Sequence, residues 1–459
     1  MHVIDSKVSI SRGYLLLILS VVFILFSILH WPNVNVVVWL TFFVIVYSLP
    51  FMALFPKIMA VLMFGTGHLI YFQQGLSFSS WQTGLLENLP LVALFVAVPL
   101  FSYPLKNGGY VDYVYKLSHR FLKRPITLFS NILLSTTMLS SFMNLGSVRI
   151  SYDLFSEDIQ QRQKFFTKAL AQGFSISMCW SPYFAGVAII VNMLELSLFP
   201  FIFWGLLLVI GGTAVSLGLI YKEARQIELK EADYPSVPEL PAQESIKMKK
   251  GAELAFVFGL MFLLLFIADL FFEINLVVMI SIVGFLFPLL WSLMIRESRS
   301  FFGSMKHYRH TVLPNLHNEA VLFIAAAFFA EMVKRTAIAD AMQMMFVYFN
   351  RASSFFIILL IIFLIAFLAF LGIHQILTVS LIGASVPLSS MAVNAETLGL
   401  AMIAGWSVAT IISPVTALNL TLGNILNKSP IQVGLWSWEY VVVVIPFMSF
   451  IIYAISFVQ

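Results

Sequence analysis

Polar and helix-breaking residues interrupt four otherwise apolar stretches of this sequence, and their side chains are suited to binding a small ligand. Two of the stretches, residues 126–158 and 353–388, carry hydroxyls, amides and glycines in their middles. The other two carry a Ser-Pro pair, at Ser181-Pro182 and at Ser413-Pro414. Proline removes a backbone donor and interrupts a helix, which leaves carbonyls and helix termini free for a ligand. These groups predict a site for a small anion, with oxygen atoms available to a cation.

The candidate binding residues come from all four stretches. Hydroxyls and amides offer hydrogen-bond donors and acceptors, and glycine lets a ligand approach the backbone. A single serine or threonine in a membrane more often serves helix packing, but the symmetric arrangement of the set favours function. The set is Ser141, Asn144, Gly146, Ser147, Ser181, Pro182, His374, Gln375, Thr378, Ser413, Pro414, Thr416 and Asn419.

Two ionisable residues near these stretches have more than one interpretation. His374 is expensive to place in a membrane without a task, and ligand binding, proton coupling and a structural hydrogen bond are its open roles. Arg149 is suited to pair with an anionic substrate, to extend its side chain to the membrane surface, or to pair with Asp153 or Glu157. The sequence leaves these alternatives open, and it assigns no metal site.

The elements that position these residues must lie in lipid. The chain has 459 residues, of which 60% are apolar and only 10% are charged, and its mean hydropathy is +0.95. A chain of this length and composition has far more apolar surface than one aqueous core can bury. Only helices and closed barrels satisfy the backbone in hydrocarbon, and the alternating pattern of a barrel is missing. The predicted fold is therefore an all-α polytopic membrane protein.

Several function classes are excluded by what the sequence lacks. The single cysteine, Cys179, cannot form an intramolecular disulfide and has no zinc-ligand spacing around it. There is no Gly-rich phosphate loop of an ATP-driven pump and no basic, aromatic-studded surface for nucleic acid. We therefore expect neither an enzyme nor a bound cofactor, apart from Na⁺ or H⁺ as a coupling ion.

Eleven transmembrane spans and two re-entrant hairpins are predicted. Basic residues mark the cytoplasmic side, which places the N-terminus in the cytoplasm of a multi-pass cell-membrane protein, in the inner membrane if the source is bacterial. Because basic residues flank both ends of residues 126–158, that segment is expected to enter and leave from the cytoplasm. The spans are residues 14–30, 35–55, 57–73, 88–104, 169–191, 198–221, 252–272, 275–294, 317–333, 398–422 and 437–457.

The two halves of the chain show an internal repeat. Ser181-Pro182 aligns with Ser413-Pro414, and Asn192 aligns with Asn424 at the same offset of 232 residues. Counting spans from the cytoplasmic N-terminus gives the two copies opposite orientations, so the second hairpin, residues 353–388, is expected to enter from outside. The predicted divisions are N-terminal helices (1–85), a first repeat (86–222), a cytoplasmic linker (223–251), scaffold helices (252–316) and a second repeat (317–459).

The order of hairpin, broken helix, hairpin and broken helix resembles the ion transporter superfamily, including its divalent anion/sodium symporter branch, over about residues 30–459. The run Ser140-Ser141-Phe142-Met143-Asn144-Leu145-Gly146 resembles the first hairpin tip. Trp180-Ser181-Pro182 and Ile412-Ser413-Pro414-Val415-Thr416 resemble the broken-helix turns. Neither tip has the Ser-Asn-Thr triplet of that branch, which leaves Na⁺ and H⁺ open as the coupling ion, and His374 favours H⁺.

The resemblance implies a homodimer that moves a small anion, usually a carboxylate, between cation sites, with a transport domain sliding against a scaffold within membrane lipid. The predicted function is therefore ion-coupled symport of a small, carboxylate-like solute by an elevator-type mechanism. A flippase or exporter of a lipid-linked substrate, or a non-transporting membrane partner protein, are the alternatives. Bound lipid between the domains would favour the flippase, whereas two symmetric hairpins have little use in a receptor.

Overall fold

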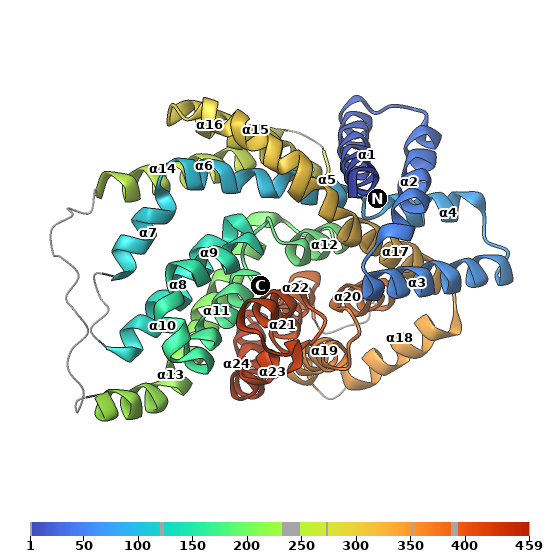
Figure 1. Ribbon diagram of the computed structural model, residues 1–459. Helices are drawn as coiled ribbons and strands as arrows, with labels where there is room; N and C mark the ends of the chain where they lie inside the picture. Colours follow the sequence, from blue (N-terminus) through green and yellow to red (C-terminus); the bar gives the residue numbers. More distant parts are fainter. Residues whose placement is uncertain are drawn as a thin grey trace.

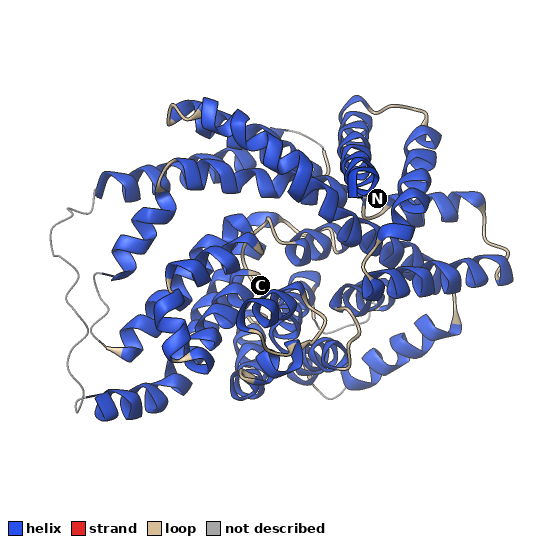
Figure 2. Cartoon of the chain, in the orientation of Figure 1, coloured by secondary structure: helices blue, strands red, loops and turns tan. Residues whose placement is uncertain are grey.

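The structure, a computed structural model, is built from helices joined by turns and short loops (Figure 2). It describes residues 2–119, 124–231, 248–271, 274–350, 353–386 and 393–458. Within these ranges no strand is formed, and eleven helices are long and apolar enough to cross a membrane. The prediction of an all-α polytopic membrane protein is confirmed.

The first 119 residues form the helices at the upper right of Figure 1 and part of the layer along its top. Four of their helical segments begin with proline at the first or second position, or contain proline nearby, which divides this region into short pieces. The elements are α1 (His2–Leu29), α2 (Val34–Ser48), η1 (Leu49–Phe51), α3 (Leu54–Gln73), α4 (Phe78–Leu86), α5 (Leu89–Ala97), η2 (Val98–Phe101), α6 (Ser102–Asn107) and α7 (Tyr110–His119).

The first unusual segment is a helical hairpin followed by a broken helix. The hairpin consists of α8 and α9, and the helix formed by α11 and α12 is interrupted at the Ser-Pro pair. The elements are α8 (Pro125–Met143), α9 (Gly146–Leu154), α10 (Ser156–Gln161), α11 (Gln163–Ser177), α12 (Ala185–Met193) and α13 (Leu198–Glu231).

Scaffold-like helices come next, and a second hairpin with its own broken helix follows them. The intervening elements are α14 (Met248–Phe271), α15 (Leu276–Met294), α16 (Ser298–His307), η3 (Tyr308–Val312), η4 (Leu313–Leu316), α17 (His317–Val333) and α18 (Ala337–Asn350). The second hairpin and broken helix comprise α19 (Ser354–Phe370), α20 (Gln375–Ser385), α21 (Ala395–Ile412), α22 (Ala417–Leu426), α23 (Pro430–Leu435) and α24 (Trp438–Ile455).

The two repeats pack in the same way. The first arm of each hairpin lies against the first half of its broken helix, as α8 on α11 and α19 on α21. The second arm crosses to the other repeat, where α9 packs on α22 and α20 packs on α12. In Figure 1 the C-terminal helices α21–α24 accordingly lie beside α8–α11. This exchange of arms puts both hairpin tips and both helix breaks in the middle of the molecule.

Equivalent glycines allow the closest of these contacts. Gly173 of α11 lies against the Leu133 carbonyl and the Thr136 side chain of α8. Gly405 of α21 lies against Ile362 and Ile365 of α19, and its offset from Gly173 is 405 − 173 = 232. Small residues at helix crossings let membrane helices approach closely, so each hairpin is fastened to its broken helix at the same place.

Helix boundaries differ from the sequence expectations where proline or a polar segment divides a span. The expected span 35–55 ends in η1 at Phe51, because Leu49-Pro50 turns the chain. The second broken helix stays helical from Ser407 to Ile412 and opens only at residues 413–416. Helix α13 reaches Glu231 and α14 begins at Met248, so both extend into the expected linker. Residues 232–247 and 387–388 lie outside the described residues.

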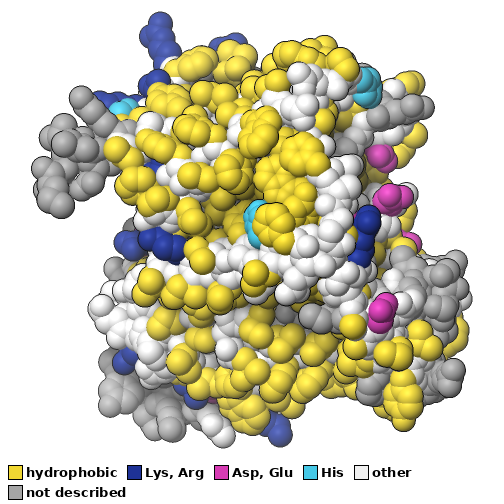
Figure 3. All heavy atoms as spheres, turned by 90° about the vertical axis from the view of Figure 1, so that its right-hand side faces the viewer, with side chains coloured by type: hydrophobic (Ala, Val, Ile, Leu, Met, Phe, Trp, Pro, Cys, Tyr) yellow, Lys and Arg dark blue, Asp and Glu magenta, His cyan; other side chains and the backbone are white. Residues whose placement is uncertain are grey.

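The outer surface matches a lipid environment. Figure 3 looks at the end of the molecule formed by α2, α3, α4 and α18, where hydrophobic side chains cover most of the face. Acidic side chains gather along its right-hand side, and Lys and Arg side chains lie mostly toward its edges. Large apolar residues such as Leu54, Phe72 and Trp39 are more than half exposed there. In water such a surface would promote association, whereas in a bilayer it contacts hydrocarbon.

Candidate binding site at the hairpin tips and helix breaks

The first hairpin tip is held by its own serines. Asn144 ends α8 with φ of +49° and ψ of −136°, a conformation that L-residues rarely adopt. The Ser147 hydroxyl donates to the Asn144 carbonyl oxygen at 2.6 Å, and its oxygen lies 2.6 Å from the Ser140 hydroxyl. Gly146 is exposed, and an added methyl group there would meet nothing within 4 Å. The tip is therefore rigid but open on one side.

The first helix break is attached to this tip. Ser181 and Pro182 are buried, and the Ser181 hydroxyl donates to the Ser141 carbonyl oxygen at 2.5 Å. The Ser141 hydroxyl in turn donates to the Thr137 carbonyl of α8 at 2.8 Å. The structure thus brings Ser141 and Ser181 together, as a binding site at the junction requires.

In the second hairpin, His374 and Gln375 have structural partners. His374 is the N-cap of α20, where its Nδ1 accepts the Ile376 backbone N–H at 3.3 Å. Gln375 Nε2 donates to the Thr410 hydroxyl of α21 at 3.4 Å, which ties the second tip to the second broken helix. Thr378 is buried on the same arm, and its hydroxyl has no hydrogen-bond partner. Of the open roles for His374, the structural hydrogen bond is therefore present.

A capping test follows from the His374 geometry. Replacing His374 with alanine removes the acceptor and is expected to destabilise the protein by about 1 kcal/mol. Replacing it with asparagine, which is a strong N-cap residue, should keep wild-type stability. The thermal midpoints of both variants in the same detergent measure the difference. An asparagine variant as unstable as the alanine variant would show that the imidazole does more than cap α20.

The second helix break is closed by two polar side chains. Asn419 is fully buried, and its Nδ2 donates to the Ile411 carbonyl at 2.6 Å and to the Ser413 carbonyl at 2.8 Å. The Thr416 hydroxyl lies 3.0 Å from the Thr410 carbonyl, which Pro414 cannot satisfy. Ser413 Oγ accepts the Val415 N–H at 3.4 Å. Asn419, Thr416, Ser413 and Pro414 therefore form one connected turn.

A reciprocal contact between the two broken helices marks a local two-fold axis. The Ser175 hydroxyl lies 2.6 Å from the Ser407 carbonyl, the Ser407 hydroxyl lies 2.9 Å from the Ser175 carbonyl, and the two hydroxyl oxygens are 2.8 Å apart. Thr410 Oγ1 lies 3.4 Å from Met178 Sδ. Both pairs keep the repeat offset, since 407 − 175 = 232 and 410 − 178 = 232. Reciprocal pairing of equivalent residues is what a two-fold relation produces.

Ser175 and Thr410 are residues that sequence reasoning missed. They sit in helical stretches without a local break, so their types alone give no signal. The offset of 232 residues that relates the two Ser-Pro pairs also relates Ser175 to Ser407. Adding 232 to the number of each polar residue of α11 would have identified Ser407 as the partner of Ser175.

A glycine of a neighbouring helix covers the carbonyls freed at each break. Gly205 of α13 lies directly on the Cys179 carbonyl, and Gly434 of α23 lies on the Ile411 and Ile412 carbonyls. Cys179 and Ile411 are themselves equivalent, since 411 − 179 = 232. Only a residue without Cβ lets a helix approach a carbonyl this closely. At both breaks, therefore, a glycine lets a neighbouring helix pack directly on the freed carbonyls.

The two repeats differ in how far their sites are exposed. Gly146 at the start of α9 and Ala417 at the start of α22 are exposed, and these two helices pack together. The equivalent starts, Gln375 of α20 and Ala185 of α12, are buried and half-buried. The starts of α9 and α22 are thus more exposed than the starts of α20 and α12.

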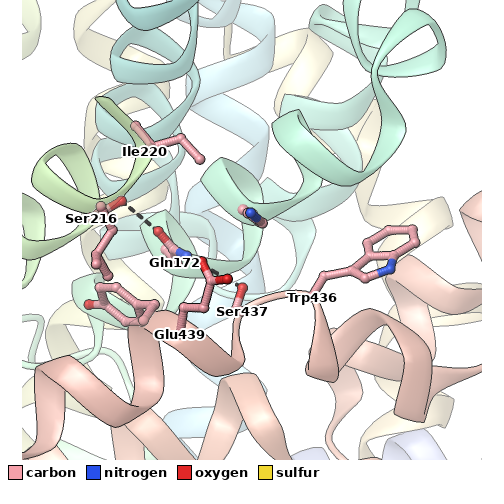
Figure 4. A pocket seen from close by; sticks show the side chains of 9 residues that line it. Gln172, Ser216, Ile220, Trp436, Ser437 and Glu439 are labelled. Atoms are coloured by element: carbon pink, nitrogen blue, oxygen red, sulfur yellow. Dashed lines mark hydrogen bonds between the residues drawn. The ribbon is translucent and has the colours of Figure 1, made fainter. Parts of the chain in front are cut away.

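A separate polar cavity lies at the other end of α11. It lies between α11, α13 and the start of α24. Figure 4 shows Gln172 at its centre, where it accepts the Ser216 hydroxyl at 2.5 Å and contacts Ser437, with Glu439 beside them. Lys168, which also lines the cavity, pairs with Glu223 at 2.8 Å. Among the thirteen candidate residues, none lines this cavity.

Arg149 is paired within its own helix. Its Nε lies 3.1 Å from an Asp153 carboxylate oxygen, and both side chains are more than half exposed. An exposed pair of this kind contributes little to stability. Of the alternatives for Arg149, the pairing with Asp153 is present. Among the described residues, no buried partner holds the Arg149 side chain toward the hairpin tip.

Sequence comparisons and structural comparisons give different results. No protein-family model matches the chain, and no curated protein matches it. The transporter YdaH of Alcanivorax borkumensis is similar in structure, with a TM-score of 0.54 and 16% identity over 83% of this chain and 88% of that one. MtrF of Neisseria gonorrhoeae, described among antimetabolite efflux pumps, has a TM-score of 0.53 and 14% identity over 85% of each chain. The chain therefore has the fold of these membrane transporters.

Proposed function

We propose that this protein is a secondary active transporter of a small anionic, carboxylate-like solute. The observation that carries the proposal is the pair of hairpin-to-break attachments, Ser181 to Ser141 and Gln375 to Thr410, placed around the Ser175–Ser407 contact. Two hairpins entering from opposite sides give a site that each side can reach in turn. The shared fold with two membrane transporters supports the same function class.

The solute class rests on the helix termini at the centre. Helices α9, α12, α20 and α22 all begin at a hairpin tip or a helix break. A helix N-terminus carries unpaired N–H groups and partial positive charge, and both favour an anion. Asn144, Ser147 and Thr416 add polar groups, and Gly146 and Ala417 keep the α9 and α22 starts accessible. In this proposal the solute binds between the first tip and the second break.

An elevator-type movement is the proposed mechanism. The unequal exposure of equivalent positions, open at Gly146 and Ala417 and closed at Gln375 and Ala185, is expected of a symmetric protein in a one-sided state. Reversing this difference in exposure would open the binding site to the other side of the membrane. In this proposal the two hairpins and broken helices move together, while α3–α5 and α14–α15 form a scaffold and a dimer interface in the membrane.

Reconstituted transport tests the proposal. Purified protein in liposomes is expected to take up or exchange radiolabelled mono- and dicarboxylates against a gradient of Na⁺ or H⁺. Ser181→Ala, which detaches the first break from the first tip, should reduce the uptake rate by about tenfold or more, because a small misplacement of binding groups is enough for such a loss. Ser130→Ala, on the first hairpin and with only a local backbone contact, is the control.

The outcome also separates this function from its alternative. Uptake of lipid-linked substrate head groups without any uptake of free carboxylates would replace the proposal with a flippase. If the protein transports neither lipid-linked head groups nor free carboxylates, although its thermal unfolding transition shows that it is folded, a transport function is contradicted. The N-terminus is proposed to be cytoplasmic, and accessibility of an N-terminal tag in right-side-out vesicles measures that orientation.

A further inference from the structure

A group of three charged side chains joins the two repeats away from the hairpin tips. Lys334 Nζ lies 2.8 Å from Glu331 Oε2 and 3.5 Å from Glu87 Oε1. Glu331 is on the last turn of α17, Lys334 follows it, and Glu87 ends α4, which packs against α17. We call these residues the Glu87–Glu331–Lys334 cluster.

The charges of the cluster do not balance. Two carboxylates share one ammonium group, so the cluster carries one net negative charge when both glutamates are ionised. The Glu331 side chain is only 10% exposed, and Glu87 Oε2 is a buried oxygen without a hydrogen-bond partner. An uncompensated charge away from water is unfavourable, and the group tends to neutralise. A proton on one carboxylate balances the charge of the cluster.

Neighbouring ionisable groups do not supply the missing positive charge. Lys57 of α3 donates to the Pro50 carbonyl, and Arg12 of α1 contacts His317. His317 and Glu319 lie at the opposite end of α17, about 18 Å away at 1.5 Å per residue. The His68 ring has both nitrogens engaged, by the Phe64 carbonyl and the Trp81 indole. Tyr47 of α2 and Tyr71 of α3 are not bases, and α5 and α20 contain no ionisable side chain. Arg335 and Asp340, which follow the cluster in the sequence, are exposed.

The position of the cluster connects it to the second hairpin. Helix α17 packs against α20, and Lys334 leads directly into α18, which also packs against α20. Glu87 belongs to the first repeat, whereas Glu331 and Lys334 belong to the second. When Glu87 is ionised, it holds Lys334 toward α4; when Glu87 is protonated, only Glu331 holds Lys334. The charge state of Glu87 therefore decides whether this ion pair links the two repeats.

We propose that the Glu87–Glu331–Lys334 cluster binds one exchangeable proton. The proton sits on a glutamate carboxyl, and its release restores the ion pair between Glu87 and Lys334. In the proposed transporter this is the coupling proton, a step that rests on the proposed function. It assigns proton binding to a site other than His374, whose Nδ1 already serves as an acceptor in the α20 cap.

Infrared spectroscopy of the detergent-solubilised full-length protein tests proton binding without any solute. Wild type should show a carboxylic acid C=O band that shifts in D₂O and disappears as the pH is raised. Glu87→Gln should lose most of that band, and Lys334→Met should move its disappearance to higher pH because no cation then favours the carboxylate. Glu297→Gln, which removes a half-buried glutamate outside the cluster, should leave the band unchanged.

Each result decides the proposal. If Glu87→Gln and Glu331→Gln both keep the wild-type band, or Lys334→Met titrates like wild type, the cluster does not hold the proton. Should either glutamine variant fail to fold, the wild-type titration and the shift in Lys334→Met still show whether the cluster holds the proton. In liposomes, Glu87→Gln should keep solute exchange and lose at least tenfold of the uptake driven by a pH gradient. No transport by any variant would count against the proposed function and leave the infrared result standing.

Discussion

Replacing Gly205 with alanine is expected to destabilise this protein by about 3 kcal/mol, the upper end of the range for overpacking a tight interior. A methyl group at Gly205 would lie well inside contact distance of the Cys179 carbonyl oxygen, and it would also crowd the backbone of Trp180. Backbone cannot rotate away as a side chain can, so α13 must move off the first helix break. The thermal midpoint of the purified variant, measured in the wild-type detergent, checks the loss.

Gly218 provides a matched control for this change. It lies on the same helix, and an added methyl group there meets nothing within 4 Å. Gly218→Ala should therefore leave stability unchanged or raise it, by up to about 1 kcal/mol from helix propensity. If Gly205→Ala behaves like Gly218→Ala, the proposed seal over the first break does not exist. Gly434→Ala, at the equivalent place over Ile411, should be destabilising but by less, because its nearest atoms are 3.0 Å away.

Replacing Asn419 with leucine is expected to produce the second large effect. Leucine has a similar size but cannot donate, so the carbonyls of Ile411 and Ser413 lose a buried donor. A buried group left without a partner costs about 1–3 kcal/mol. The Ser413 carbonyl keeps the Thr416 hydroxyl at 3.2 Å, so the predicted destabilisation is about 1–3 kcal/mol, from the Ile411 carbonyl. If the protein is a transporter, solute uptake should fall with it, since the N-terminus of α22 is no longer fixed.

Asn424→Leu is the control for Asn419→Leu. It makes the same chemical change on the same helix, but Asn424 is exposed, so stability should stay within about 0.5 kcal/mol of wild type. Asn419→Asp separates donation from size, because an ionised carboxylate accepts only. An aspartate variant as stable as wild type would mean that the two Nδ2 contacts do not hold the break.

The sequence by itself determined the fold class and the places where helices break. With 60% apolar residues and few charges, lipid is the only solvent that suits the chain, and helices follow from the need to satisfy the backbone. Pro182 and Pro414 cannot donate a backbone hydrogen bond, so the interruptions at those positions are local and readable. Asn144 and Gly146, as turn-forming residues, likewise mark the first tip from sequence alone.

Only the tertiary structure decided which polar groups meet. Ser175 and Ser407 are 232 residues apart, and nothing local to either helix signals that their hydroxyls pair. The cluster of Glu87 with Lys334 also depends on α4 packing against α17, whereas the sequence places these residues at the ends of unrelated spans. The reason is physical: a break is set by the residue's own backbone chemistry, but a buried polar contact is set by how distant helices pack, where each hydroxyl or carboxylate has many geometrically possible partners.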